Sequence, residues 1–313
     1  MSSNDIEIIE VRDEAEWRDH FAKVRHKFMT QSWAFGEAKR ATNWRPRRLL
    51  FKSGGEALAI CQVLHKVVAG VPVAARINCG PLFLNESAER AADILRTVRN
   101  RWRFLYRSVL LIAPNLAHCE ENEELLRAIG FRMWTQYKWG SSQLNLTRSA
   151  QVLRTSLESK WRNQLKKSEQ AGLQFHSGNS LQDAEWIIGC HAQHVREKGF
   201  DGPTPAFLLA LYRASPIEFN VYRAVHDGRD LAGMVAYRFC DVAHYYVGWN
   251  GSEGRRLNAG NFLLWNAALD LRRQGCTRFD LGGHDLHASS GFDRFKLGMN
   301  GDQYQLVGEF YCL

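Results

Sequence analysis

The stretch at 261–298, NFLLWNAALDLRRQGCTRFDLGGHDLHASSGFDRFKLG, decides the fold of this chain. Apolar residues at helical spacing predict a helix that ends at Gly275, and a short strand is expected to follow at 277–281. The strand ends in the glycine pair Gly282–Gly283, and a lysine follows in the segment FDRFKLG. Core packing explains the helix and the strand. It does not explain a double glycine, or a lone lysine that lies between Phe295 and a further glycine, Gly298. We therefore expect a functional site beyond the end of this strand.

A second stretch, QSWAFGEAK at 31–39, indicates a loop that enters a helix and presents a lysine. It lies within a basic region, because residues 23–48 hold eight lysines and arginines and one acidic side chain. The net charge of the whole chain is +8, and residues 1–150 carry most of it, with 23 basic against 16 acidic side chains. Such a concentration suits an anionic partner such as a phosphate, a nucleotide or tRNA. A solvated basic surface explains the charge equally well.

Length and composition limit the class of protein. The 313 residues are enough for two domains of about 150 residues each. No stretch approaches the ~20 apolar residues that a membrane span needs, and the acidic N-terminus lacks the apolar core of a secretory signal. We therefore expect a cytoplasmic protein. The seven cysteines are scattered without CxxC spacing, which argues against a disulfide framework and against a zinc site, and we expect no metal.

The same order of elements is predicted twice along the chain. In the first half, strands are expected at 6–11, 47–52, 57–68, 108–114 and 138–146, and helices at 13–28, 87–106 and 122–129. In the second half, helices are expected at 151–171, 181–198, 205–214 and 258–274, and strands at 173–176, 219–226, 231–240, 243–249 and 278–281. Each half is an α/β unit that contains an antiparallel meander. We predict two domains, at 1–148 and 149–313.

The turn at 250–260 bears on the choice of donor. Acyl-CoA-dependent enzymes of the GNAT fold carry a signature of the type Q/R-x-x-G-x-G/A here, whose backbone N–H groups bind pyrophosphate at the start of a helix. In this chain the corresponding residues are RRLNAG at 255–260. Counted from Arg255 only Gly260 fits, and counted from Arg256 an alanine takes the place of a glycine. A Cβ there obstructs a phosphate, which disfavours coenzyme A as the donor.

Taken together, the segments 31–39, 157–172, 243–270 and 275–298 resemble the FemAB (FemX-like) family of tRNA-dependent aminoacyl transferases. The most specific match is GCTRFDLGG followed by GFDRFKLG. The resemblance implies two tandem GNAT-like (acyl-CoA N-acyltransferase-like) domains around a shared cleft, and the absence of paired heptads predicts no coiled-coil arm. It also implies aminoacyl-tRNA as the co-substrate with no further cofactor. The implied acceptor is an amine of a small molecule, a natural-product intermediate or a cell-wall precursor that contains phosphate.

The resemblance also assigns roles to residues. It places Lys296 near the aminoacyl ester, where an ammonium would stabilise the oxyanion that forms when an amine attacks. It implies that Lys39 binds phosphate groups of the acceptor. An aspartate beside the glycine pair could accept a proton from the amine, or only bind backbone N–H groups. The predicted catalytic residues are Lys296, Asp280 and Tyr246; the predicted substrate-binding residues are Lys39, Arg40, Trp33, Tyr245, Gly283, Asp285 and Phe295; and the predicted tRNA-binding residues are Arg162, Lys166, Lys167, Arg255 and Arg256.

Two other functions stay open at this point. One is an acyl-CoA-dependent N-acyltransferase of the same fold, which would bind acetyl-CoA tightly. The other is a protein that binds tRNA or another nucleic acid and has lost transferase activity, for which salt-sensitive RNA binding is expected.

Overall fold

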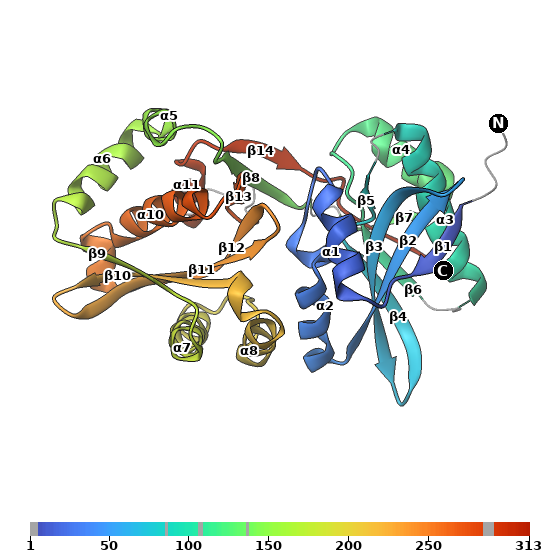
Figure 1. The fold of residues 1–313 in the computed structure, drawn as a ribbon, viewed down its shortest axis with the longest axis horizontal. Coiled ribbons are helices and arrows are strands. Elements are labelled where there is room, and N and C mark those ends of the chain that lie inside the picture. The colour runs from blue at the N-terminus through green and yellow to red at the C-terminus, as the bar shows by residue number, and fades with distance from the viewer. Residues whose placement is uncertain (1–5, 85–86, 106–108, 136–137, 284–290) are drawn as a thin grey trace. The chain divides into compact units, whose positions relative to one another are not determined.

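The computed structural model describes residues 6–84, 87–105, 109–135, 138–283 and 291–313 (Figure 1). The chain forms two compact units, of which the first is Met1–Trp139 together with Gln305–Leu313 and the second is Gly140–Tyr304. The structure thus divides the chain at 139/140 and again at 304/305, whereas the sequence predicted one boundary at 148/149. Strand pairing explains the difference, because the segment after Trp139 pairs within the second sheet and the last strand of the chain returns to the first.

The first unit is built on a mixed sheet. In the described residues this sheet has eight strands in the order β1-β2-β3-β4-β6-β15-β7, with β5 paired to β3. The strands are β1 (Glu7–Glu10), β2 (Trp44–Ser53), β3 (Glu56–Val68), β4 (Val71–Asn78), β5 (Leu82–Phe83), β6 (Val109–Ala113), β7 (Arg132–Thr135) and β15 (Glu309–Cys312). The helices are α1 (Glu14–Lys23), η1 (Met29–Gln31), α2 (Trp33–Lys39), η2 (Arg40–Thr42), α3 (Ala88–Leu105) and α4 (Glu120–Ile129). Helix α3 buries Leu95, Val98 and Trp102 against the sheet, as its amphipathic pattern predicts.

The second unit carries helices on both faces of its sheet (Figure 1). Its strands have the order β14-β8-β13-β12-β11-β10-β9 within the described residues. They are β8 (Gly140–Asn145), β9 (Gln174–Gly178), β10 (Phe219–His226), β11 (Arg229–Phe239), β12 (Val242–Asn250), β13 (Arg278–Asp280) and β14 (Asp302–Gln305). The helices are α5 (Ala150–Ser156), α6 (Ser159–Glu169), α7 (Leu181–Lys198), α8 (Pro205–Ala214), η3 (Pro216–Glu218), α9 (Ser252–Arg256), α10 (Ala259–Arg273) and α11 (Gly291–Leu297). Helices α6 and α10 cover one face, and α7 and α8 cover the other.

Two irregularities in the second sheet lie at the candidate site. Strands β12 and β13 run parallel, and their ladder ends at the pair His244↔Asp280. On its other side β12 pairs with β11, and the register shifts so that Tyr246 is the extra residue of a β-bulge. Bulges redirect neighbouring side chains and end regular pairing. Beyond His244, β12 continues past the end of β13 while it remains paired with β11 as far as Asn250.

Some expected elements differ in the structure. The single helix expected at 151–171 is two helices, α5 and α6, because Glu158 donates its backbone N–H to the carbonyl of Gly298 instead of continuing a helical ladder. The helix expected at 13–28 ends at Lys23, and α9 was not expected. No helix in the described part of the chain is both long and apolar enough to cross a bilayer.

Candidate active site

Lys296 is buried in the last turn of α11, with 3% of its surface exposed. Its Nζ donates to the carbonyl of Gly283 at 3.0 Å and lies 5.2 Å from the centre of the Tyr245 ring. Burial lowers the pKa of this ammonium to about 8, against the opposing effect of the carboxylates of Asp280 and Asp293. Such a lysine carries a charge at neutral pH and loses it in mildly alkaline solution.

The motif that contains Lys296 is fixed to α6 by one tryptophan. The Trp161 indole donates to the carbonyl of Phe295 at 2.9 Å, and the two rings lie 6.2 Å apart. Gly298 leaves room for this contact, because a Cβ there would stand 2.5 Å from Trp161 Cδ1. The final glycine of FDRFKLG is therefore required by packing, and it holds the neighbouring lysine in place.

The glycine pair has a definite structural reason. Gly282 has φ +76°, a left-handed conformation that favours glycine, and a Cβ there would stand 2.6 Å from the Tyr245 carbonyl oxygen. The same point lies 3.3 Å from Lys296 Nζ and 3.6 Å from His244 Nε2. Gly282 therefore allows a close approach of the Tyr245 carbonyl, and the two nitrogen atoms lie around the same glycine, at the place where β12 and β13 separate.

Asp280 is a buried carboxylate surrounded by donors. Ser141 Oγ, Tyr304 OH and the Gly282 N–H donate to it at 2.5, 2.7 and 2.9 Å, and Gln143 Nε2 donates at 3.1 Å. Burial alone would raise the pKa of Asp280, but contacts with His244, Ser141 and Tyr304 hold it well below its ordinary value. So weak a base is unsuited to the proton-accepting role predicted for it. The other predicted aspartate, Asp285, lies outside the described residues.

His244 is the residue that sequence reasoning missed. Its Nδ1 lies 3.4 Å from Asp280 Oδ1, and its Nε2 lies 3.6 Å from the point where a Cβ on Gly282 would stand. A histidine on a strand gives no motif by spacing alone. The signal available in the sequence was its place on the last strand of the meander. In the structure this strand pairs with the strand that ends in FDLGG.

The two tyrosines predicted for the site separate onto opposite faces of β12. Tyr245 joins the core cluster that includes α10, and its ring lies beside Lys296. Tyr246 packs against Phe207 of α8 on the other face, with ring centres 6.5 Å apart. Burial raises the pKa of both phenols, so neither is ionised at neutral pH. Tyr245 is thus close to Lys296, whereas Tyr246 contacts the helix layer on the opposite face.

Two adjoining grooves lie next to this site within the second unit. The apolar groove, of about 710 Å³, is bounded by Gly233, Met234, Tyr245, Gly248, Trp249, Leu263, Leu264, His194 and Lys198, among others. The polar groove, of about 900 Å³, is bounded by Glu158, Lys160, Trp161, Gln164, Asn258, Asn261 and Arg294, among others. Asn250, Arg255, Gly260 and Phe295 line both. Phe295 precedes Lys296 in the chain, and Tyr245, whose ring centre lies 5.2 Å from Lys296 Nζ, lines the apolar groove.

The predicted tRNA-binding residues have different positions. Arg255 lines both grooves and donates to the Asn250 carbonyl, whereas Arg256 is exposed and pairs with Glu253 at 3.4 Å. On α6, Lys167 follows Lys160 and Gln164 of the polar groove at helical spacing, whereas Arg162 and Lys166 share another face. Sequence reasoning overlooked the groove-lining Lys160 and Arg294.

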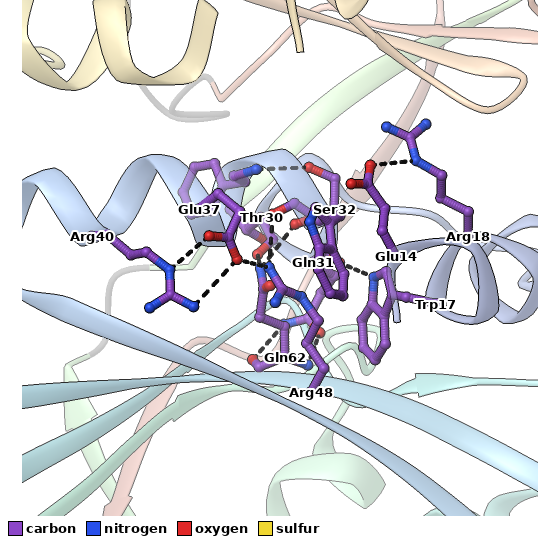
Figure 2. A network of polar contacts seen from close by, with 12 residues as sticks. Glu14, Trp17, Arg18, Thr30, Gln31, Ser32, Glu37, Arg40, Arg48 and Gln62 are labelled. Carbon is purple, nitrogen blue, oxygen red and sulfur yellow. Dashed lines mark hydrogen bonds and ion pairs between the residues drawn. The ribbon is translucent and has the colours of Figure 1, made fainter. Parts of the chain in front are cut away.

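The first unit holds the other predicted binding residues around α2, and Figure 2 shows the polar network to which Arg40 belongs. Arg40 forms an ion pair with Glu37 at 2.6 Å. The buried Arg48 reaches the same carboxylate at 3.0 Å and stacks on the Trp33 ring at 3.4 Å. Lys39 lies 5.2 Å from the centre of the Phe35 ring, and burial and the charge of Arg76 lower its pKa. Trp33 and Arg40 are thus engaged in contacts with Arg48 and Glu37. Lys39 is a partly buried lysine whose pKa is lowered.

The network also explains the segment QSWAFG. Gln31 is fully buried and donates to the carbonyls of Gln62 and Asn78, and the Gln62 N–H donates back to its Oε1 at 2.6 Å. Gln62 in turn donates to the carbonyls of Thr30 and Ser32. These bonds tie the start of α2 to β3 and to the end of β4 (Figure 2).

Comparison with known proteins supports the fold. A family model described as an acetyltransferase (GNAT) domain matches residues 155–304. A search among curated protein sequences found no match to the chain. The crystal structure of FemX superposes with a TM-score of 0.83 at 14% identity, covering 97% of this chain and 96% of FemX.

Two further solved structures share the architecture. One is a tandem GNAT protein from the clavulanic acid biosynthesis pathway, with a TM-score of 0.58 at 12% identity and 98% coverage of each chain. The other is L-PGS from Bacillus licheniformis, with a TM-score of 0.56 at 14% identity, covering 97% of this chain and 93% of that one. The predicted α/β fold of two tandem GNAT-like units is confirmed: residues 155–304 match the GNAT domain, and the chain as a whole has the fold of FemX.

Proposed function

We propose that this protein transfers an aminoacyl group from aminoacyl-tRNA to the amine of an acceptor, at a site in the second unit. The observation that carries the proposal is the buried ammonium of Lys296, which lies beside Gly282 and 5.2 Å from the ring of Tyr245, a residue that lines the apolar groove. An ammonium held in a water-poor site stabilises a developing oxyanion more strongly than one in water. The shared fold with FemX supports the same proposal.

The polar groove suits the 3′ end of a tRNA. Lys160, Arg255 and Arg294 supply cations for phosphate groups along it. The partly buried Phe295 supplies an aromatic face on which a base of a single strand can stack. The groove reaches Phe295, which precedes Lys296 in the chain, and we propose that a nucleotide bound there presents its ester to the lysine. The apolar groove beyond it would receive the side chain of the amino acid.

The reaction requires little from the protein besides placement and charge. The amine nitrogen attacks the ester carbonyl, the carbon–nitrogen bond forms, and the ribose oxygen leaves with the bonding electrons. Because the ester is already activated, holding both reactants in contact supplies much of the rate. Lys296 would donate a hydrogen bond to the oxyanion between these two steps.

We assign phosphate groups of the acceptor to Lys39, because it is the partly buried lysine at the end of α2. The assignment applies to an acceptor that bears phosphate, and it is the role that the FemAB resemblance implies for Lys39. The acceptor is otherwise defined only as an amine.

An acyl-CoA-dependent N-acyltransferase is the second candidate, and the match of residues 155–304 to a GNAT domain favours it. The turn before α10 argues against it. A Cβ on Gly254 would stand 2.4 Å from the Leu231 carbonyl oxygen, and one on Gly260 would stand 3.0 Å from Asn250 Nδ2. The position of Gly254 is thus filled by contacts within the protein, and the turn lacks the run of open glycines that a pyrophosphate requires.

A deacylation assay tests the proposal. Purified protein is mixed with tRNA charged with radiolabelled amino acids and with a cell extract as the source of acceptor, and acetyl-CoA is offered in a parallel reaction. We expect loss of one amino acid from tRNA that depends on the extract, that Lys296→Ala abolishes, and that the exposed-site control Lys23→Ala preserves. Consumption of acetyl-CoA with all aminoacyl-tRNA intact would overturn the proposal and establish the second candidate.

A further inference from the structure

We propose that His244 is the general base of the transfer and that Asp280 is its positioning residue. The inference deepens the proposed function and rests on it, because it assigns the proton of the attacking amine to a group in the same site. Lys296 cannot both hold a positive charge on the oxyanion and accept this proton. A second group is therefore required, and His244 has the geometry for it.

The imidazole of His244 and the ammonium of Lys296 lie around the same glycine. His244 Nε2 and Lys296 Nζ lie 3.6 and 3.3 Å from the same point, which is where a Cβ on Gly282 would stand. The two nitrogens therefore lie within about 7 Å of each other, around the same glycine. A general base must come within hydrogen-bond reach of the proton that it abstracts, and an amine bound beside Gly282 between the two nitrogens would be within reach of Nε2.

The other nitrogen of the His244 imidazole faces the buried carboxylate of Asp280. His244 Nδ1 lies 3.4 Å from Asp280 Oδ1, so the carboxylate accepts from Nδ1–H and leaves the lone pair on Nε2. Asp280 is itself fixed by Ser141, Gln143, Tyr304 and the Gly282 N–H. A base oriented by a third group that is locked in place is the arrangement that activates nucleophiles in many transferases.

The other titratable groups around His244 are compatible with this role. Tyr237 lies opposite it on β11, and its hydroxyl donates to Glu218 at 2.6 Å. Tyr246 on the same strand lies with its ring centre 6.2 Å from the imidazole, and burial keeps its phenol protonated. Lys296 Nζ approaches the same glycine as His244 Nε2, at 3.3 Å from the point where a Cβ on Gly282 would stand.

The proposed step balances in atoms and charge. The amine attacks as its N–H proton passes to His244 Nε2, which becomes an imidazolium stabilised by Asp280. The same proton then passes to the ribose oxygen as the carbon–oxygen bond breaks, so that the products are an amide and a free hydroxyl. The histidine returns to its neutral form, and no other reactant is required.

The test compares pH profiles of the rate constant for transfer under saturating donor. We expect His244→Gln to lower this constant by about 100-fold or more, as loss of a general base does, and to remove the acidic limb of the profile. Imidazole added to His244→Ala should restore part of the rate, and the affinity for aminoacyl-tRNA should stay within twofold in both variants. His226→Gln is the matched control, because His226 Nδ1 lies 3.5 Å from Asp227 on a surface turn.

The outcomes separate this inference from the proposed function. An active wild type whose rate and acidic limb persist in His244→Gln overturns the base and leaves aminoacyl transfer standing. A wild type that uses neither aminoacyl-tRNA nor acetyl-CoA overturns both. A measurement without turnover completes the test: long-range ¹H–¹⁵N NMR should show His244 protonated at Nδ1, and protonation at Nε2 would overturn the inference.

Discussion

At the scale of single residues, the buried charge of Lys296 destabilises the fold, although the proposed reaction requires it. Lowering the pKa of a lysine from 10.5 to about 8 means that the folded protein disfavours the charged form. Each pK unit corresponds to about 1.4 kcal/mol, so the buried charge destabilises the fold by about 3 kcal/mol at most. We expect Lys296→Met to raise the free energy of unfolding at pH 7 by about 1 to 3 kcal/mol while abolishing transfer. Urea denaturation measures this, and a less stable variant would contradict it.

The same lysine should set the alkaline limit of activity. The ammonium is lost as the pH rises through about 8, and oxyanion stabilisation is lost with it. Transfer should therefore decline above that pH in the wild type and continue to higher pH in Lys296→Arg, since arginine stays charged. For stability the sign is opposite: between about pH 8 and 10.5 the unfolded state binds more protons, so the wild type gains stability there. A variant with the same alkaline decline as the wild type would refute the assignment.

Asp280 has the opposite effect on stability. Its pKa is depressed, so its contribution is present above the pKa of an unfolded aspartate and is lost as the pH falls below that value. Asp280→Asn leaves Ser141, Tyr304 and His244 without their anionic acceptor, and loss of a buried charged partner costs about 3 to 5 kcal/mol. We expect thermal melts at pH 7 to show this loss and the gap to narrow near pH 3. An equal gap at both values would contradict the ionised state of Asp280.

At the scale of elements, α2 is placed by a glycine that approaches a buried glutamine and arginine. A Cβ on Gly36 would stand 2.1 Å from Gln62 Oε1 and 2.8 Å from Arg48 Nη2, both of which belong to the network in Figure 2. Gly36→Ala should destabilise the protein by about 1 to 3 kcal/mol through overpacking. Gly189→Ala is the matched control, because Gly189 is exposed within α7 and a Cβ there meets nothing within 4 Å. That control should be neutral or stabilise by up to about 1 kcal/mol.

Elements with strong local patterns were predictable, and contacts between distant segments were not. The helix and strand of 261–281 follow from periodicity, and the glycine pair follows from its position at a strand end. The break between α5 and α6 depends on a bond from Glu158 to Gly298, which lies 140 residues away in the chain. His244 and Asp280 likewise meet only through the parallel pairing of β12 with β13. Sequence reasoning therefore found the carboxylate and the lysine, and missed the histidine between them.

At the scale of the whole molecule, the chain completes its first sheet with its last strand. β15 lies between β6 and β7 and pairs with both, and it buries Phe310 in the core of the first unit. All strands of the second sheet, by contrast, start between Gly140 and Asp302. The second unit is thus inserted into the first, which explains why a single boundary did not describe the division.

This topology predicts which fragments fold. Residues 140–304 hold a complete sheet and core, so they should melt cooperatively when expressed alone, whereas residues 1–139 should not, because β6 and β7 lose the strand between them. Joining 139 to 305 with a short glycine linker should restore the first unit, since the Leu306 N–H already donates to the Trp139 carbonyl at 2.8 Å. Circular dichroism melts and amide NMR spectra of the three fragments measure this. A cooperative melt of residues 1–139 alone would show that β15 is dispensable and would refute the insertion as the basis of the first unit's stability.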